Sequence, residues 1–189
     1  MKNFLIVTAL LALILGLTAK LALSDDDHDG QERKWSDLFK PTSGVAPVLN
    51  KKYVTECSSC HMAYPAGLLP ARSWEKIMLT LDSHFGENAE LDPQSLSELT
   101  KYLVDNSADK SGYRRSKKIM RSLTEKDVPL RITETPYIMR KHDEIPQKLI
   151  KANPKVASLS NCIACHRNAE NGSFNEHEIN IPGYGHWED

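Results

Sequence analysis

The chain has 189 residues, which is enough for one ordinary domain or two small ones. It carries 24 lysines and arginines against 25 aspartates and glutamates, a formal net charge of −1. This balance argues against a nucleic-acid-binding protein, which needs a clear positive excess.

Residues 1–24 are expected to be a secretory signal peptide. Lys2 precedes the apolar run "FLIVTALLALILGL", and the small residues Ala22 and Ser24 stand just before an acidic segment that starts at Asp25. The apolar run is too short and too soon interrupted for a typical membrane span. An uncleaved N-terminal anchor is the alternative. We therefore expect an exported protein, in which oxidising conditions would tend to pair any spare thiol.

Residues 25–44 are polar and acidic and are expected to form a flexible tether, so that packed structure begins near Val45. A first helix is predicted to start near Pro47, because proline suits the first turn of a helix. Its inward-facing side chains would be Val48, Leu49, Tyr53 and Cys57.

Two more helices are predicted before residue 107. Ser73 is a suitable N-cap for a helix that Gly86 follows as the C′ residue, and Asp92 with Pro93 opens the next one. The first of these presents Trp74, Ile77, Met78, Leu81, His84 and Phe85 on one face. The second presents Leu96, Leu99, Tyr102 and Leu103. Residues 45–107 thus form a small helical unit, and so short a segment usually needs a staple or a cofactor.

Residues 108–189 are expected to form a second, less regular unit. It opens with a polar segment, 108–130, whose basic side chains are Arg114, Arg115, Lys117, Lys118 and Arg121. We interpret this segment as the solvated surface of a linker, with docking of an acidic partner as the alternative. "LRIT" is expected to be extended, and short helices are predicted to open at Pro136 and Pro146. A last short helix is expected to end at Gly172.

Two hexapeptides contain all four cysteines, namely "ECSSCH" at residues 56–61 and "NCIACH" at residues 161–166. Two thiols at this spacing can add to the two vinyl groups of one haem, and the histidine that follows then lies under the iron as an axial ligand. The sequence therefore predicts two covalently attached haems. The predicted attachment residues are Cys57, Cys60, Cys162 and Cys165, and the predicted proximal ligands are His61 and His166.

Three other interpretations of the cysteine pairs explain less. A thioredoxin-like Cys-x-x-Cys needs a strand–helix context and no following histidine. Zinc knuckles usually stand about 15–20 residues apart, whereas these pairs begin at Cys57 and Cys162. Two local disulfides would leave both histidines unexplained.

The second axial ligand decides what each haem can do, because methionine raises the reduction potential, histidine lowers it and an open position admits ligands. For the first haem His84 is the preferred candidate, since it shares the apolar face of its predicted helix. Met78 is the competitor, and Met62 directly follows the proximal ligand and should not reach the other side.

For the second haem His142 is the preferred candidate, at the end of a short predicted helix. An exposed histidine among charged neighbours is an equally good interpretation from the residues alone. His177, His186 and Met139 are the alternatives, and His28 in the acidic tether is expected to bind no iron.

The segments "YVTECSSCHMAYPAGLLPARSW", "HFGE", "LRITETPYIMRKHDEIP" and "SLSNCIACHRNAENGSF" closely resemble the small periplasmic dihaem cytochrome c family of bacteria. The resemblance covers roughly residues 45–183. It implies a mainly α protein, with a class I cytochrome c-like N-terminal haem domain at 45–107 and a smaller, irregular helical C-terminal haem domain at 108–189. It also implies bis-histidine haems, with His84 and His142 as distal ligands, although the pairing of each with its haem stays open.

The function that this resemblance implies is a periplasmic one-electron relay and not an enzyme, so that no catalytic residue is expected. Redox proteins are the implied partners. In some members they are a small high-spin haem protein and a membrane cytochrome b, which would be reached by transient docking. The alternative is a haem enzyme or gas sensor in which one haem is five-coordinate.

Overall fold

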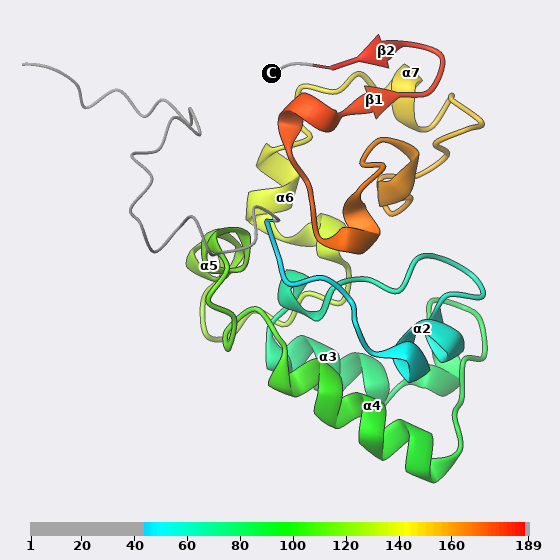
Figure 1. The fold of residues 1–189 in the computed structure, drawn as a ribbon, viewed down its shortest axis with the longest axis vertical. Coiled ribbons are helices and arrows are strands. Elements are labelled where there is room, and N and C mark those ends of the chain that lie inside the picture. Colours follow the sequence, from blue (N-terminus) through cyan, green and yellow to red (C-terminus); the bar gives the residue numbers. More distant parts are fainter. Residues whose placement is uncertain (1–43, 188–189) are drawn as a thin grey trace, which may run out of the picture. The chain divides into compact units, whose positions relative to one another are not determined.

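The structure is a computed structural model that describes residues 44–187 (Figure 1). The predicted signal peptide, 1–24, and nearly all of the predicted tether, 25–44, lie outside these residues. The described chain is mainly helical with little sheet, and none of its helices is long and apolar enough to cross a membrane. The helices are α2 (Lys51–Cys57), α3 (Ala71–Met78), α4 (Pro93–Asp105), α5 (Arg114–Arg121), α6 (Pro136–Arg140) and α7 (Gln147–Ile150), and the strands are β1 (Asn180–Ile181) and β2 (Gly185–His186).

The helix predicted from Ser73 to residue 85 is shorter than expected. α3 begins at Ala71, and Ser73 is fully buried inside it and does not act as a cap. The helix ends at Met78 because the Thr80 hydroxyl donates to the carbonyls of Lys76 and Ile77, at 3.0 and 3.3 Å. Such local side-chain bonds compete with continued helix. A 3₁₀ turn over Leu81–Ser83 follows, so His84 lies in a turn beyond the helix.

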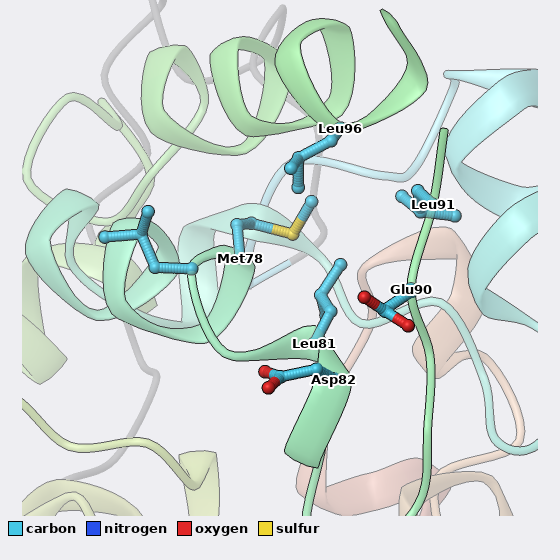
Figure 2. Close-up of a pocket in the computed structure, with 7 residues that line it drawn as sticks. Met78, Leu81, Asp82, Glu90, Leu91 and Leu96 are labelled. Carbon is cyan, nitrogen blue, oxygen red and sulfur yellow. The ribbon is translucent and has the colours of Figure 1, made fainter. Parts of the chain in front are cut away.

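A pocket of about 250 Å³ lies between the end of α3 and the start of α4. Figure 2 shows the side chains of Met78, Leu81 and Leu96 pointing toward one another there, with the carboxylates of Asp82 and Glu90 to one side. Leu81 is the first residue of the turn that leads to His84. Apolar side chains of the pocket therefore lie beside that turn.

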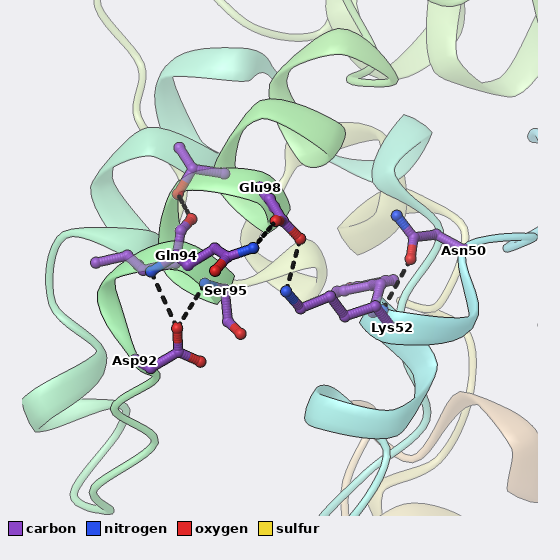
Figure 3. A network of polar contacts seen from close by, with 9 residues as sticks. Asn50, Lys52, Asp92, Gln94, Ser95 and Glu98 are labelled. Atoms are coloured by element: carbon purple, nitrogen blue, oxygen red, sulfur yellow. Dashed lines mark hydrogen bonds and ion pairs between the residues drawn. The ribbon is translucent and has the colours of Figure 1, made fainter.

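α4 is the predicted element that the structure reproduces most closely. The carboxylate of Asp92 accepts hydrogen bonds from the backbone N–H groups of Gln94 and Ser95, both at 3.0 Å (Figure 3). This is the arrangement of a helix N-cap. Lys52 on α2 donates to the carboxylate of Glu98 on α4 at 2.6 Å, so the polar network joins the two helices.

α2 starts later than predicted. Its N-cap is Asn50, whose side-chain oxygen accepts a hydrogen bond from the Tyr53 backbone N–H at 3.0 Å. The expectation that Leu49 faces inward was wrong: its side chain is 82% exposed, because it precedes the cap and takes no part in the helix. Tyr53 is buried as predicted.

The first apolar core lies among α2, α3 and α4, and α3 packs beside α4 (Figure 1). The buried side chains of this core are Tyr53, Ala63, Ala66, Leu69, Trp74, Ile77, Met78, Leu99 and Leu103. The Trp74 indole N–H donates to the carbonyl of Ala66 at 2.8 Å, which fixes the loop after the first cysteine motif against α3. Three helices and that loop therefore enclose the first apolar core.

The second core contains a helix that the sequence did not predict. α5 falls within the segment 108–130, which was expected to be a solvated linker. Its Ile119 and Ser116 are fully buried, and the Ser116 hydroxyl donates to the carbonyl of Gly67 at 2.7 Å. Ile119 packs with Val45, Leu68 and Tyr137. Most side chains of α5 are basic and only a narrow stripe is apolar, so the sequence pattern did not indicate a packed helix.

The C-terminal part is irregular. The short helix predicted over residues 161–172 is replaced by two 3₁₀ turns, Cys162–Ala164 and Ala169–Asn171. Gly172 ends the second turn in the left-handed conformation, as its predicted C-terminal position favours. β1 and β2 form an antiparallel pair that was not predicted.

Gly172 joins the start of the described chain to the second cysteine motif. Its carbonyl accepts a hydrogen bond from the Val45 N–H at 3.2 Å, and its φ is +77°. A Cβ at this position would lie 2.4 Å from the Val45 carbonyl oxygen and 3.2 Å from the Pro47 nitrogen. Both the backbone conformation and the space therefore require glycine.

We expect Gly172→Ala to lower the free energy of unfolding by about 2–5 kcal/mol, from the strained φ together with the clash against backbone. Chemical denaturation of the haem-loaded protein measures the change. Gly183→Ala is the matched control, because Gly183 has a φ of +79° and a Cβ added there would have nothing within 4 Å. The free energy of unfolding of this control should fall by only about 1 kcal/mol. Equal losses in the two variants would show that the contact with Val45 contributes nothing.

Candidate functional site

The first site is built around His61 and His84. The centres of their rings lie 6.2 Å apart, with 34° between the ring planes. His61 comes shortly after α2 ends at Cys57, so the motif is presented by the C-terminal end of that helix. The Nδ1 atom of His61 lies 2.8 Å from the carbonyl oxygen of Met62. Because a carbonyl can only accept, Nδ1 carries the proton and Nε2 keeps its lone pair for a metal.

His84 is held by a tight turn. Its backbone N–H donates to the carbonyl of Glu87 at 2.8 Å, and the Glu87 N–H donates back at 3.2 Å. The two central residues, Phe85 and Gly86, have φ values of +55° and +104°, as in a type I′ turn. Burial lowers the pKa of His84, and the neighbouring His61 and Arg131 lower it further. A lowered pKa favours the neutral imidazole, which is the form that binds a metal.

The second site likewise consists of a motif histidine and a second histidine that faces it. The ring centres of His142 and His166 lie 6.0 Å apart, with 74° between the ring planes. His142 follows α6, and its Nδ1 lies 2.8 Å from the carbonyl oxygen of Ile138, one helical turn earlier. Burial lowers the pKa of His166 to about 4, with smaller contributions from His142 and from Arg115.

Both histidine pairs fit an iron ion between their rings. Two imidazoles that bind one metal ion from opposite sides, each through a bond of about 2.0–2.1 Å, hold their ring centres roughly 6–6.5 Å apart. The Nδ1 contacts of His61 and His142 to carbonyl oxygens are those typical of metal-binding histidines. His166 differs, since its Nδ1 is buried without a hydrogen-bond partner among residues 44–187.

The four cysteines form no disulfide in this structure, and each pair directly precedes the histidine of its motif. Cys60 is exposed, and Cys57, Cys162 and Cys165 are half-buried. Burial raises the pKa of Cys57 and of Cys162 to about 11. A thiol-redox protein needs the opposite, a depressed thiol pKa that supplies thiolate. A site for a bare metal ion would need three or more His, Cys, Asp or Glu side chains close together. The described part of the chain contains no such group.

The other candidate ligands are a methionine in the first core and three residues further along the chain. Met78 is buried in the first core and lines the pocket of Figure 2. Met139 on α6 is 56% exposed. His177 is exposed in a 3₁₀ turn, and the Nδ1 of His186 on β2 contacts the carbonyl oxygen of Ile179 at 2.9 Å. The histidine ring that faces His166 is that of His142.

Two residues of the sites could not be identified from the sequence. The Tyr64 ring stacks on His61, with centres 4.7 Å apart and 25° between the planes. Arg115 was grouped with the exposed basic residues, yet its guanidinium lies against the rings of Tyr137 and Phe174, each at 5.9 Å. Phe174 in turn contacts His166 at 5.4 Å. Both residues act through contacts between distant segments, for which local patterns hold no signal.

Two Cys-x-x-Cys-His motifs, each with a second histidine facing the first, define a c-type haem protein with two sites. The protein-family model described as dihaem cytochrome c matches residues 53–174. The chain belongs to the dihaem cytochrome c family, and it carries two covalently bound c-type haems. Among curated proteins we find no significant match.

Solved structures of dihaem cytochromes match as well. The protein from Shewanella baltica OS155 is 45% identical, with a TM-score of 0.62 over 74% of this chain and 98% of that one. A structure from Rhodobacter sphaeroides is 49% identical, with a TM-score of 0.62 over 69% of this chain and 100% of that one. A second structure from that organism is 48% identical, with a TM-score of 0.53 over 68% and 99%. Membership of this family indicates electron transfer.

Proposed function

We propose that this protein is a one-electron relay in which both haems are six-coordinate with two histidine ligands. His61 and His84 would bind the first iron, and His142 and His166 the second. The observation that carries the proposal is the spacing of the two ring pairs, 6.2 and 6.0 Å, which suits an iron ion between each. Cys57 with Cys60, and Cys162 with Cys165, would hold the two macrocycles.

Each haem supplies a one-electron couple between ferric and ferrous iron. Two histidine ligands on each iron would leave no place for a substrate at the metal. The turn at Phe85 and Gly86 fixes His84, and the Ile138 carbonyl orients His142. These features favour electron transfer over catalysis. No observation among the described residues favours a five-coordinate haem.

Export to the periplasm and redox partners belong to the same proposal. They are supported by the signal-peptide pattern of residues 1–24 and by the family resemblance. The partners would be a small high-spin haem protein and a membrane cytochrome b, reached by transient docking.

Carbon monoxide tests the coordination directly. We expect the absorption spectrum of the reduced, haem-loaded protein to stay unchanged when carbon monoxide is added, because neither iron has an open position. A spectral shift in the unaltered protein would favour a gas sensor or enzyme instead.

Arg115 should tune the second haem. Its guanidinium donates to the Tyr137 hydroxyl at 3.0 Å and to the Phe174 carbonyl at 2.9 Å, which fixes a positive charge near His166. A nearby cation disfavours the ferric state, which carries the higher positive charge. We expect Arg115→Leu to lower the reduction potential of the second haem by several tens of millivolts and to leave the first nearly unchanged.

A redox titration followed by absorption measures both potentials. Arg115→Lys is the matched control, because it keeps the charge and loses the forked hydrogen bonds. Arg115→Lys should keep the reduction potential of the second haem close to that of the unaltered protein. If the lysine variant falls as far as the leucine variant, then the hydrogen bonds and not the charge set the potential.

A further inference from the structure

Tyr64 connects the first site to the segment just before the second cysteine motif, and its proposed role rests on the function proposed above. The ring of Tyr64 stacks on that of His61 with 4.7 Å between centres. Its hydroxyl donates to the backbone carbonyl of Ser160 at 2.6 Å, across 96 residues of sequence. One side chain therefore joins the proximal histidine of the first haem to the segment that leads into the second cysteine motif.

The connection continues to the second attachment residue. The Cys162 sulfur lies 3.6 Å from the same Ser160 carbonyl oxygen that accepts the Tyr64 hydroxyl. The chain itself links the two residues through Asn161. From the His61 ring, the path runs through one ring stack, one hydrogen bond and a few covalent bonds to a predicted thioether sulfur.

Other buried aromatic hydroxyl and N–H groups in the first core make only local connections. The Tyr53 hydroxyl donates to the carbonyl of Tyr64 at 2.9 Å, and its ring contacts Tyr102 at 5.5 Å. The Trp74 indole bonds to Ala66, eight residues away. These contacts hold one core together, whereas that of Tyr64 spans the two sites.

We propose that Tyr64 is the residue that couples the two haem sites electronically. One electron leaves ferrous iron at one site and reduces ferric iron at the other, so that one centre is oxidised as the other is reduced. The tyrosine stays a neutral phenol throughout, and no bond or proton is transferred. Its ring and its hydroxyl hydrogen bond serve as the medium between His61 and the Cys162 segment.

The test compares Tyr64→Phe with the unaltered protein, both haem-loaded and full-length. A pulse of reductant, smaller than the haem content, is followed by absorption as the electron redistributes between the haems. Tyr64→Phe keeps the ring on His61 and removes the bond to Ser160, so we expect redistribution to become several-fold slower. Tyr64→Leu removes both contacts and should be slower still. Tyr102→Phe, which removes a hydroxyl from a partly buried tyrosine that packs against the same core, should keep the original rate.

Further readouts separate coupling from a merely structural role. Both reduction potentials and the unfolding midpoint are measured for each variant, and rates are compared at equal driving force. An unchanged rate in Tyr64→Phe, or a slowing that disappears once the potentials are matched, would overturn the proposal. If Tyr64→Leu fails to retain haem, Tyr64→Phe alone decides. Carbon monoxide binding by the unaltered protein would instead refute the proposed coordination, whatever the Tyr64 variants do.

Discussion

His84→Ala is expected to bind carbon monoxide at the first haem, while the unaltered protein binds none. On the proposed coordination, removal of the imidazole that faces His61 would open the first iron to an external ligand. Haem attachment should persist, because the thioether bonds and His61 are untouched. In the reduced protein about half of the haem should shift its absorption on addition of the gas, since the second site is unaltered.

The matched control is His177→Ala, which removes an exposed histidine from a short turn after the second motif. It should leave the spectrum unchanged with and without the gas. His142→Ala is the counterpart for the second site. It should allow carbon monoxide to bind at the second haem, which is the other half of the total haem. If His84→Ala keeps the original spectrum, then His84 is no ligand, and Met78 in the neighbouring pocket becomes the next candidate to test.

Cys162→Ala is expected to reduce or abolish covalent attachment of the second haem. The two sulfur atoms of the motif bind two vinyl groups, so one bond is lost outright and the orientation of the other is no longer fixed. Mass spectrometry of the purified protein under denaturing conditions counts the haems that remain. We expect a large fraction of chains with a single haem, together with a lower unfolding midpoint, because a bound cofactor stabilises the native state.

Ile163→Ala is the control for this substitution. Ile163 stands inside the same motif and is 42% exposed, but it offers no thiol. The control should keep two haems. A Cys162→Ala protein that still carries two haems, each joined through two bonds, would contradict the assignment of Cys162.

The parts of the fold that could be predicted are those encoded by adjacent residues. Asp92 caps the start of α4 by accepting hydrogen bonds from the backbone N–H groups of Gln94 and Ser95, and Pro93 occupies its first turn. Gly172 has the left-handed conformation that its predicted position favours. The cysteine motifs likewise need only local spacing, and two haems follow from them.

Other features were missed, either because a local side-chain bond overrides the helical pattern or because the contacts join segments far apart in sequence. The apolar spacing up to Phe85 suggested one helix, but the hydroxyl of Thr80 ends it early. His84 faces His61 nonetheless, because a tight turn takes over the role expected of the helix. Tyr64 and Arg115 could not be identified from their neighbours, since their partners are Ser160 and Phe174.

Electron paramagnetic resonance of the fully oxidised, haem-loaded protein tests the central claim most directly. Iron with two histidine ligands is low-spin in the ferric state, so the spectrum should contain two low-spin species of equal intensity and no high-spin signal. A high-spin ferric signal that accounts for one of the two haems would contradict the account.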